Sequence, residues 1–161
     1  MTIQIGDSIP KTSFVIMTPD GPEQRSSDQI FKGKKIVLFG VAGAFTPVCD
    51  KNHLPGFLNN IGAFKGRGID DIAVTSVNDI FVMDAWAKGT GANDKITFLA
   101  DGNGDFARAL GLSLDLTARG LGIRSQRYAM IVDDGAVRKL NVEASPGKVE
   151  SSSAEALLKD L

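Results

Sequence analysis

The order of short apolar runs and helical patterns is the feature that most constrains the fold of this chain. The run "KKIVLFGVAG" (34–43) is continuous, rich in β-branched residues and ended by glycine, as is typical of a strand buried on both faces. Similar runs at 68–79 and 95–101 predict two more strands. The segment 126–143 predicts a hairpin, because two apolar runs flank an Asp-Gly turn signal at Asp134-Gly135.

Helical patterns separate these runs. The first helix is expected over 49–68, where Pro55 and Gly56 should kink or divide it. The second is expected behind Asn78 or Asp79 as its cap and should end at Gly89. A short helix is expected over 104–112, and a last one over 151–161 has serine caps and a glutamate three residues after Ser152.

Together, the elements run β-α-β-α-β-α-β-β-α behind an N-terminal hairpin-like segment. This order predicts an α/β fold with a central mixed β-sheet flanked by helices, and a thioredoxin-like layout satisfies it. No repeat, linker or low-complexity segment divides the sequence, so residues 1–161 are expected to form a single domain.

Charge and composition exclude several classes of partner. The chain carries 18 Lys and Arg against 19 Asp and Glu, which argues against a nucleic-acid surface or a polybasic membrane contact. No apolar run approaches the length of a bilayer span, which is about 18 to 20 residues. The start "MTIQIGDSIP" has neither the basic region nor the apolar core of a signal peptide, so a cytoplasmic location is expected.

Cys49 is the only cysteine and His53 the only histidine of the sequence, so neither an internal disulfide nor a cysteine-ligated structural zinc site is expected. Thr46-Pro47 before Cys49 predicts a helix start, with threonine as N-cap and proline at the first helical position. Cys49 then lies in the first turn, where the helix dipole favours a thiolate nucleophile. The alternative is that Cys49 packs as a small buried hydrophobe, and local sequence alone leaves both interpretations open.

A family resemblance extends this picture. The segment "GVAGAFTPVCDKNHLPGF" resembles the active-site segment of the peroxiredoxins, specifically the type II class related to the fifth mammalian peroxiredoxin. Agreement continues through "IGDSIP", "FKGKKIVLFG", "SVNDIFVMDAW", "RSQRYAMIVDDG" and "KLNVEASPGK". Thr46 and Cys49 fall on the family pattern Pro-x-x-x-Thr-x-x-Cys, Arg127 falls on the family's distant arginine, and Ala42 occupies the proline position.

The resemblance implies a thiol-dependent peroxidase that reduces hydrogen peroxide and organic hydroperoxides through a sulfenic acid on Cys49. Arg127 and Thr46 are its implied catalytic partners, because a guanidinium and a hydroxyl can hold both peroxide and thiolate. Backbone N–H groups near Gly43 and Ala44 are expected to help bind the substrate.

Two positions near the thiol leave questions open. His53 is assigned to the substrate-binding set, with a supporting or purely structural role as alternatives. Alanine in place of proline at position 42 is expected to leave the loop freer and the sulfur more exposed, and so to give a slower or more easily overoxidised enzyme.

Reduction of the sulfenic acid on Cys49 requires another molecule. Some relatives carry a second cysteine at one of two places, and this chain has no cysteine at either. Val74 occupies the first, and "GKVESSS" (147–153) covers the second. A one-cysteine mechanism without a bound cofactor is therefore expected, recycled by glutathione with glutaredoxin or else by thioredoxin. Phe45, Phe81 and Trp86 are expected to lie in the core or at a dimer interface, and the resemblance implies a homodimer that pairs through the face near the active site. The main alternative is a peroxide sensor or non-catalytic redox interaction protein on the same fold.

Overall fold

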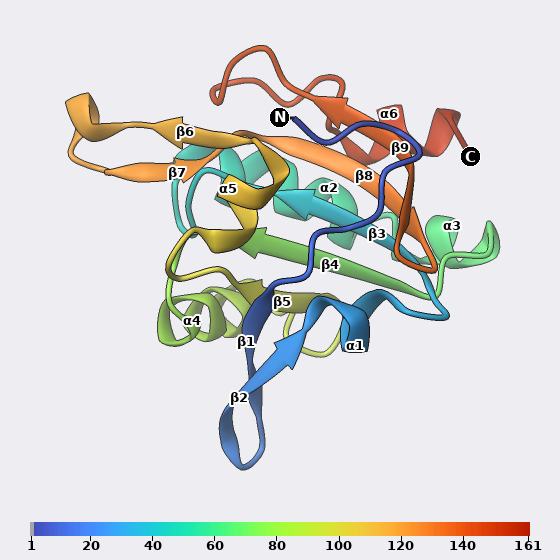
Figure 1. Ribbon diagram of the computed structural model, residues 1–161, viewed down its shortest axis with the longest axis horizontal. Coiled ribbons are helices and arrows are strands. Elements are labelled where there is room, and N and C mark those ends of the chain that lie inside the picture. Colours follow the sequence, from blue (N-terminus) through green and yellow to red (C-terminus); the bar gives the residue numbers. More distant parts are fainter. Residues whose placement is uncertain (1) are drawn as a thin grey trace.

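A seven-stranded mixed sheet forms the centre of the computed structural model, which describes residues 2–161 (Figure 1). Its strand order is β2-β1-β5-β4-β3-β8-β9. The strands of this sheet are β1 (Ser13–Thr18), β2 (Gly21–Ser26), β3 (Lys35–Gly40), β4 (Asp71–Ser76), β5 (Thr97–Ala100), β8 (Tyr128–Asp133) and β9 (Ala136–Val142). Strands β3, β4 and β5 pair in parallel, whereas β1–β2, β1–β5, β3–β8 and β8–β9 pair antiparallel. The predicted α/β fold with a mixed sheet is confirmed.

Helices cover both faces of the sheet (Figure 1). They are α1 (Ser27–Phe31), the π turn η1 (Cys49–His53), α2 (Leu54–Leu58), α3 (Ile61–Gly66), α4 (Ile80–Thr90), α5 (Asp105–Leu110), the 3₁₀ turn η2 (Thr117–Arg119) and α6 (Ala154–Lys159). Among residues 2–161, no helix has the length and apolar character to cross a bilayer.

Two hydrophobic clusters lie on the two faces of the sheet, because successive strand side chains point to opposite sides. In β3, Val37 and Phe39 belong to the first cluster, whereas Ile36 and Leu38 belong to the second. Burial on both faces is what the continuous apolar run of this strand predicts. Cys49 packs in the first cluster, on the same face as Phe39.

Helix ends differ in two places from the sequence prediction. Helix α4 passes through Gly89 and ends at Thr90, and Gly91 follows as its C-cap with a φ of 73°, the left-handed conformation that glycine adopts readily. Helix α6 is capped by Ser153, whose side chain accepts from the Ala156 N–H, and not by Ser152. Ser152 is unavailable because its buried hydroxyl bonds elsewhere, as described below.

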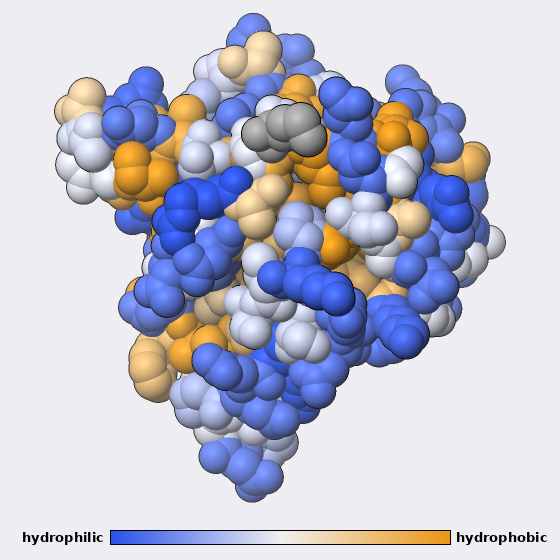
Figure 2. All heavy atoms as spheres, in the orientation of Figure 1, coloured by the Kyte–Doolittle hydropathy of each residue, from blue (hydrophilic) through white to orange (hydrophobic). Residues whose placement is uncertain are grey.

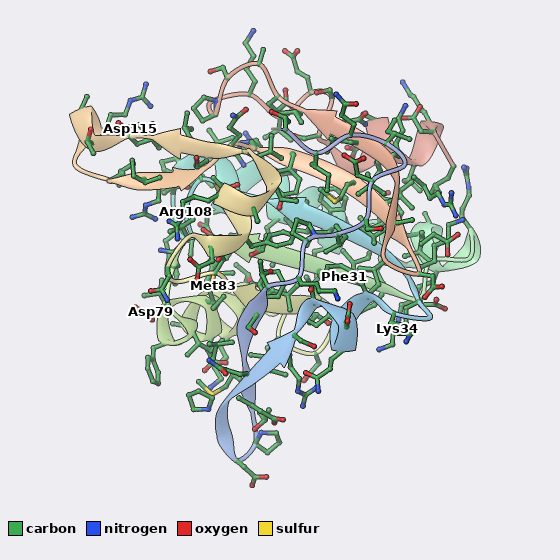
Figure 3. The ribbon with its side chains drawn as sticks, in the orientation of Figure 1. Phe31, Lys34, Asp79, Met83, Arg108 and Asp115 are labelled. Carbon is green, nitrogen blue, oxygen red and sulfur yellow. The ribbon has the colours of Figure 1, made fainter. Side chains whose placement is uncertain are left out.

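A short hairpin that the sequence did not predict projects from the body of the molecule (Figure 1). Its strands β6 (Ser113–Asp115) and β7 (Ile123–Ser125) are three residues each, too short to give a periodic pattern. Figure 3 places Asp115 on this hairpin, Arg108 on α5 and Met83 on α4.

The exposed surface is largely hydrophilic in the view of Figure 2, with separate apolar patches. Four large apolar side chains of the described chain are exposed: Ile5, Phe45, Phe81 and Ile123. Phe45 lies in the loop before Cys49, and Phe81 lies in the first turn of α4.

Gly40 and Tyr128 form the last pair of the β3–β8 ladder. A Cβ atom at position 40 would collide with the aromatic ring of Tyr128, which is fully buried. Glycine therefore lets the ring lie across the strand. The arrangement holds the end of β3, where the loop to Cys49 begins, close to Arg127, which immediately precedes β8.

Candidate active site

The loop between β3 and Cys49 is held by hydrogen bonds at both ends. The Ala44 N–H donates to Asn78 Oδ1 at 3.0 Å, and the Thr46 hydroxyl donates to the Gly43 carbonyl at 2.6 Å. Phe45 between them has a φ of 64°, a left-handed conformation that is uncommon for a bulky residue. These contacts give the loop a defined shape, with Phe45 turned outward and Gly43 buried.

The predicted helix start is confirmed, although its cap works differently from the prediction. The helix begins at Pro47, and the Thr46 carbonyl accepts from the Asp50 N–H at 2.8 Å. Thr46 thus occupies the N-cap position, but its hydroxyl proton is given to Gly43. While that bond is made, the Thr46 oxygen is left as an acceptor, suited to receive a hydrogen bond from the O–H of a bound hydroperoxide.

Cys49 begins a π turn that the sequence analysis did not foresee. The Leu54 N–H bonds to the Cys49 carbonyl five residues earlier, and Pro55 follows directly. The wider turn accommodates proline, which has no N–H to continue the ordinary pattern. The helix consequently runs past Pro55 to Leu58 and is divided at Asn59-Asn60 rather than at Pro55-Gly56.

Arg127 uses all three nitrogens of its guanidinium within the site. Its Nη2 donates to Cys49 Sγ at 2.8 Å, its Nη1 to His53 Nδ1 at 3.0 Å, and its Nε to the Pro146 carbonyl at 2.9 Å. The side chain is 2% exposed. No carboxylate within residues 2–161 forms an ion pair with it. The positive charge is therefore directed at the sulfur, and the contact favours the thiolate form.

His53 is neutral and supports Arg127. Burial, followed by the positive charge of Arg127, lowers the pKa of His53 from 6.5 to about 3. Its Nδ1 accepts from Arg127 and its Nε2 is 2.9 Å from the Ser152 carbonyl, which fixes the tautomer with the proton on Nε2. Both ring nitrogens are engaged by the protein, so neither is free for the substrate contact that the sequence analysis assigned to His53.

The expected exposure of the sulfur was wrong. Cys49 is fully buried, and Ala42 itself is only 7% exposed. The loop gains its order from the hydrogen bonds of Ala44 and Thr46, so it does not depend on a proline at position 42. The expected effects of Ala42 on rate and overoxidation stay predictions.

Of the two backbone groups expected to bind substrate, one is already occupied. The Ala44 N–H is bonded to Asn78, whereas a role for the backbone near Gly43 stays a prediction. Asn78 is itself a residue that sequence reasoning missed, because it was considered only as a helix cap, and Asp79 fills that place (Figure 3).

The sequence analysis assigned no role in this site to Glu143 or Ser152. Both are buried in the segment after β9, where Ser152 contacts His53 through its carbonyl and Glu143 accepts from the Ser152 hydroxyl. No local pattern marks them, since His53 and Ser152 are 99 residues apart in the chain. In the described part of the chain, no cluster of three His, Cys, Asp or Glu side chains is arranged to hold a metal ion.

Comparison with known proteins identifies the family of this chain. The Redoxin family model matches residues 4–158. Peroxiredoxin-2C of Oryza sativa subsp. japonica is 46% identical over 160 residues, which cover 99% of this chain and 98% of the relative. The structure of reduced Prx3 from Vibrio vulnificus in complex with hydrogen peroxide superimposes with a TM-score of 0.93 at 44% identity, covering 99% of each chain. A Plasmodium falciparum antioxidant protein, described as a 1-Cys peroxiredoxin, gives a TM-score of 0.91 at 26% identity, covering 99% of this chain and 100% of that one.

Cys49 lies at the start of a helix, and the buried Arg127 donates a hydrogen bond to its sulfur. The family match spans nearly the whole sequence around this site. The chain belongs to the peroxiredoxins, the thiol peroxidases of the Redoxin family.

Proposed function

We propose that this protein is a one-cysteine peroxidase that reduces hydrogen peroxide and organic hydroperoxides and is recycled by an external thiol. The observation that carries the proposal is the 2.8 Å contact between Arg127 Nη2 and Sγ of Cys49, the only cysteine among the 161 residues. Cys49, Arg127 and Thr46 are its proposed catalytic residues.

In the first step, the Cys49 thiolate attacks one oxygen of the hydroperoxide and the O–O bond breaks. Sulfur gives up two electrons and becomes a sulfenic acid, while the second oxygen leaves as water or an alcohol after taking a proton. Arg127 stabilises the negative charge that moves from sulfur to the leaving oxygen. The Thr46 oxygen accepts from the peroxide O–H and so orients the substrate.

In the second step, an external thiol attacks the sulfenic sulfur, releases water and forms a mixed disulfide with Cys49. A second thiol then attacks that disulfide and frees the Cys49 thiolate. Because Cys49 is fully buried, both peroxide and a thiol reach the sulfur only when the loop or the first helical turn moves. A thiol is larger than hydrogen peroxide, so recycling needs a wider opening than oxidation does.

Two similarities support the proposal. The Vibrio vulnificus relative was solved with hydrogen peroxide, and the Plasmodium falciparum relative is described as a 1-Cys peroxiredoxin. A single cysteine requires the reductant to come from outside the chain. Glutathione with glutaredoxin is the reductant that we propose first, and thioredoxin is the second.

The proposal predicts sustained peroxide consumption by the reduced protein when glutathione and glutaredoxin are supplied. The same assay is run with thioredoxin and its reductase, and with Cys49→Ser as the control that lacks the nucleophile. We expect many turnovers with one of these systems and none with Cys49→Ser. Consumption of one peroxide per protein, without further turnover in either system, would instead favour the alternative function as a peroxide sensor.

We further propose that two copies pair through the face that carries Phe45 and Phe81, and that the protein acts in the cytoplasm. The two exposed aromatic side chains lie on neighbouring elements, since Ala44 beside Phe45 bonds to Asn78 just before α4. Exposed aromatic residues of this kind commonly form interfaces. Sedimentation equilibrium is expected to give the mass of a dimer for the natural chain and of a monomer for Phe81→Asp, and a monomer for both would overturn the pairing.

A further inference from the structure

The segment that follows β9 contacts the site of Arg127 at two points. The Pro146 carbonyl accepts from Arg127 Nε at 2.9 Å, and the Ser152 carbonyl receives the Nε2 proton of His53 at 2.9 Å. One contact acts on the guanidinium directly, and the other fixes the imidazole that accepts from Nη1. The direction in which Nη2 points at Cys49 therefore depends on where this segment lies.

Glu143, at the start of this segment, forms hydrogen bonds with residues at its far end. Its Oε2 accepts from the Ser152 N–H at 2.7 Å, from the Ser152 hydroxyl at 2.6 Å and from the Glu150 N–H at 2.7 Å. Its own N–H donates to the Arg127 carbonyl at 2.9 Å. Glu143 thus ties the far end of the segment, including the Ser152 carbonyl, to the backbone of Arg127.

We propose that Glu143 is a positioning residue for peroxide reduction: through Ser152 and His53 it holds the guanidinium of Arg127 in the direction of Cys49. Glu143 touches neither the sulfur nor the guanidinium, so its effect passes through a chain of hydrogen bonds. The inference rests on the proposed function of Cys49 and Arg127. It adds a residue that contacts neither side chain and orients Arg127 through Ser152 and His53.

The negative charge of Glu143 suits this role. Burial alone would raise the pKa of Glu143, but hydrogen bonds from Ser152 and Glu150 outweigh burial and hold the pKa below its usual value. The carboxylate is therefore ionised and acts only as an acceptor, as three donors require. The charged groups that face His53 are Arg127 and Glu143, and only Arg127 bonds to the ring directly.

The first measurement determines the tautomer of the His53 ring. Because His53 is the only histidine in the chain, the ring-nitrogen spectrum of the protein labelled with ¹⁵N contains one imidazole. We expect a single tautomer, protonated at Nε2, in the natural chain. In Glu143→Ala, where the Ser152 carbonyl is no longer anchored, we expect the ring signals to move toward the average of the two tautomers.

The second measurement compares two reactions of the reduced thiol in a single turnover, without any recycling system. Reaction with hydrogen peroxide needs Arg127 oriented toward both the sulfur and the leaving oxygen, whereas alkylation by iodoacetamide depends on Arg127 only through the amount of thiolate, and otherwise on access. We expect Glu143→Ala to lower the peroxide rate constant about 10- to 100-fold, because a misplacement of about 1 Å at a catalytic group can cost about 100-fold. The alkylation rate should change much less.

Glu155→Gln is the matched control, because Glu155 is exposed in the nearby helix α6 and forms no side-chain bond to this network. It should leave both rates and the imidazole signals unchanged. Glu143→Gln keeps the shape of the side chain and should fall between Glu143→Ala and the natural chain. If Glu143→Ala does not fold, Glu143→Gln replaces it in both measurements.

Different outcomes separate this inference from the function on which it depends. If the natural chain does not react with peroxide, the proposed function fails. If the natural chain reacts but both Glu143 variants keep its ratio of peroxide to alkylation rates and its single tautomer, Glu143 has only a structural role and the inference is overturned. A loss of thermal stability without those changes would also count against it.

Discussion

Replacing Arg127 by glutamine is expected to lower the rate constant for the reaction of Cys49 with peroxide by about 100- to 1,000-fold, the usual cost of losing a preorganised donor to developing negative charge. The amide is neutral and cannot reproduce the three bonds that the guanidinium makes to Cys49, His53 and Pro146. Stopped-flow measurement of the reduced protein with hydrogen peroxide gives this rate constant directly.

Arg127→Lys separates charge from geometry. Lysine keeps the positive charge but has a single nitrogen, so it cannot bond to the sulfur while also meeting His53 Nδ1 and the Pro146 carbonyl. We expect its rate to stay at least about tenfold below that of the natural chain. Arg138→Gln is the control, because this arginine is exposed on β9. An Arg127→Gln variant as fast as Arg138→Gln would remove Arg127 from the mechanism.

The stability of the folded protein is expected to fall as the pH is lowered from 6.5 toward 3, and His53 is the cause. Its pKa is 6.5 in the unfolded chain and about 3 in the folded one, so the unfolded state binds the extra proton in this window. The free energy of unfolding therefore rises with pH between these values, by up to about 1.4 kcal/mol per pH unit. The contribution is fully present above pH 6.5.

Comparison with His53→Gln isolates this contribution, because an amide does not titrate. Asp101, whose pKa is raised through burial, contributes alike in both proteins. The lowered pKa of Glu143 comes mainly from hydrogen bonds with Ser152 and Glu150, and His53 is its smallest cause, so Glu143 contributes nearly alike in both. Chemical denaturation at several pH values should show the difference in stability between the two proteins shrinking as the pH falls below 6.5. Parallel pH profiles would mean that His53 is not kept neutral in the fold.

Sequence reasoning succeeded where the signal is local. The apolar run of β3 predicted a strand buried on both faces, and Thr46-Pro47 predicted the helix that begins at Pro47. Both depend on neighbouring residues and on the backbone preferences of single side chains. The family pattern then pointed to Arg127, and the structure brings this residue to Cys49 across 78 positions of the chain.

What escaped prediction depends on folding over long distances or on competition between partners. The Thr46 hydroxyl was expected to cap the helix, but the Gly43 carbonyl takes its proton. His53 was placed with the substrate because it follows Cys49 by four residues, yet its ring is held between Arg127 and Ser152, which are 74 and 99 residues away. Only the completed fold decides which of several possible partners a polar side chain meets.

The π turn at Cys49–His53 has a consequence for how such a site can change over evolutionary time. Deleting one residue between Cys49 and His53 would restore the ordinary helical spacing ahead of Pro55, where a proline ring clashes with the carbonyl four residues earlier and kinks or breaks the helix. A descendant with that deletion would therefore displace His53, the acceptor for Nη1 of Arg127, in one event. Insertions and deletions in this turn should therefore be far rarer among functional descendants than substitutions, and a lineage that kept one would need a new acceptor for the arginine.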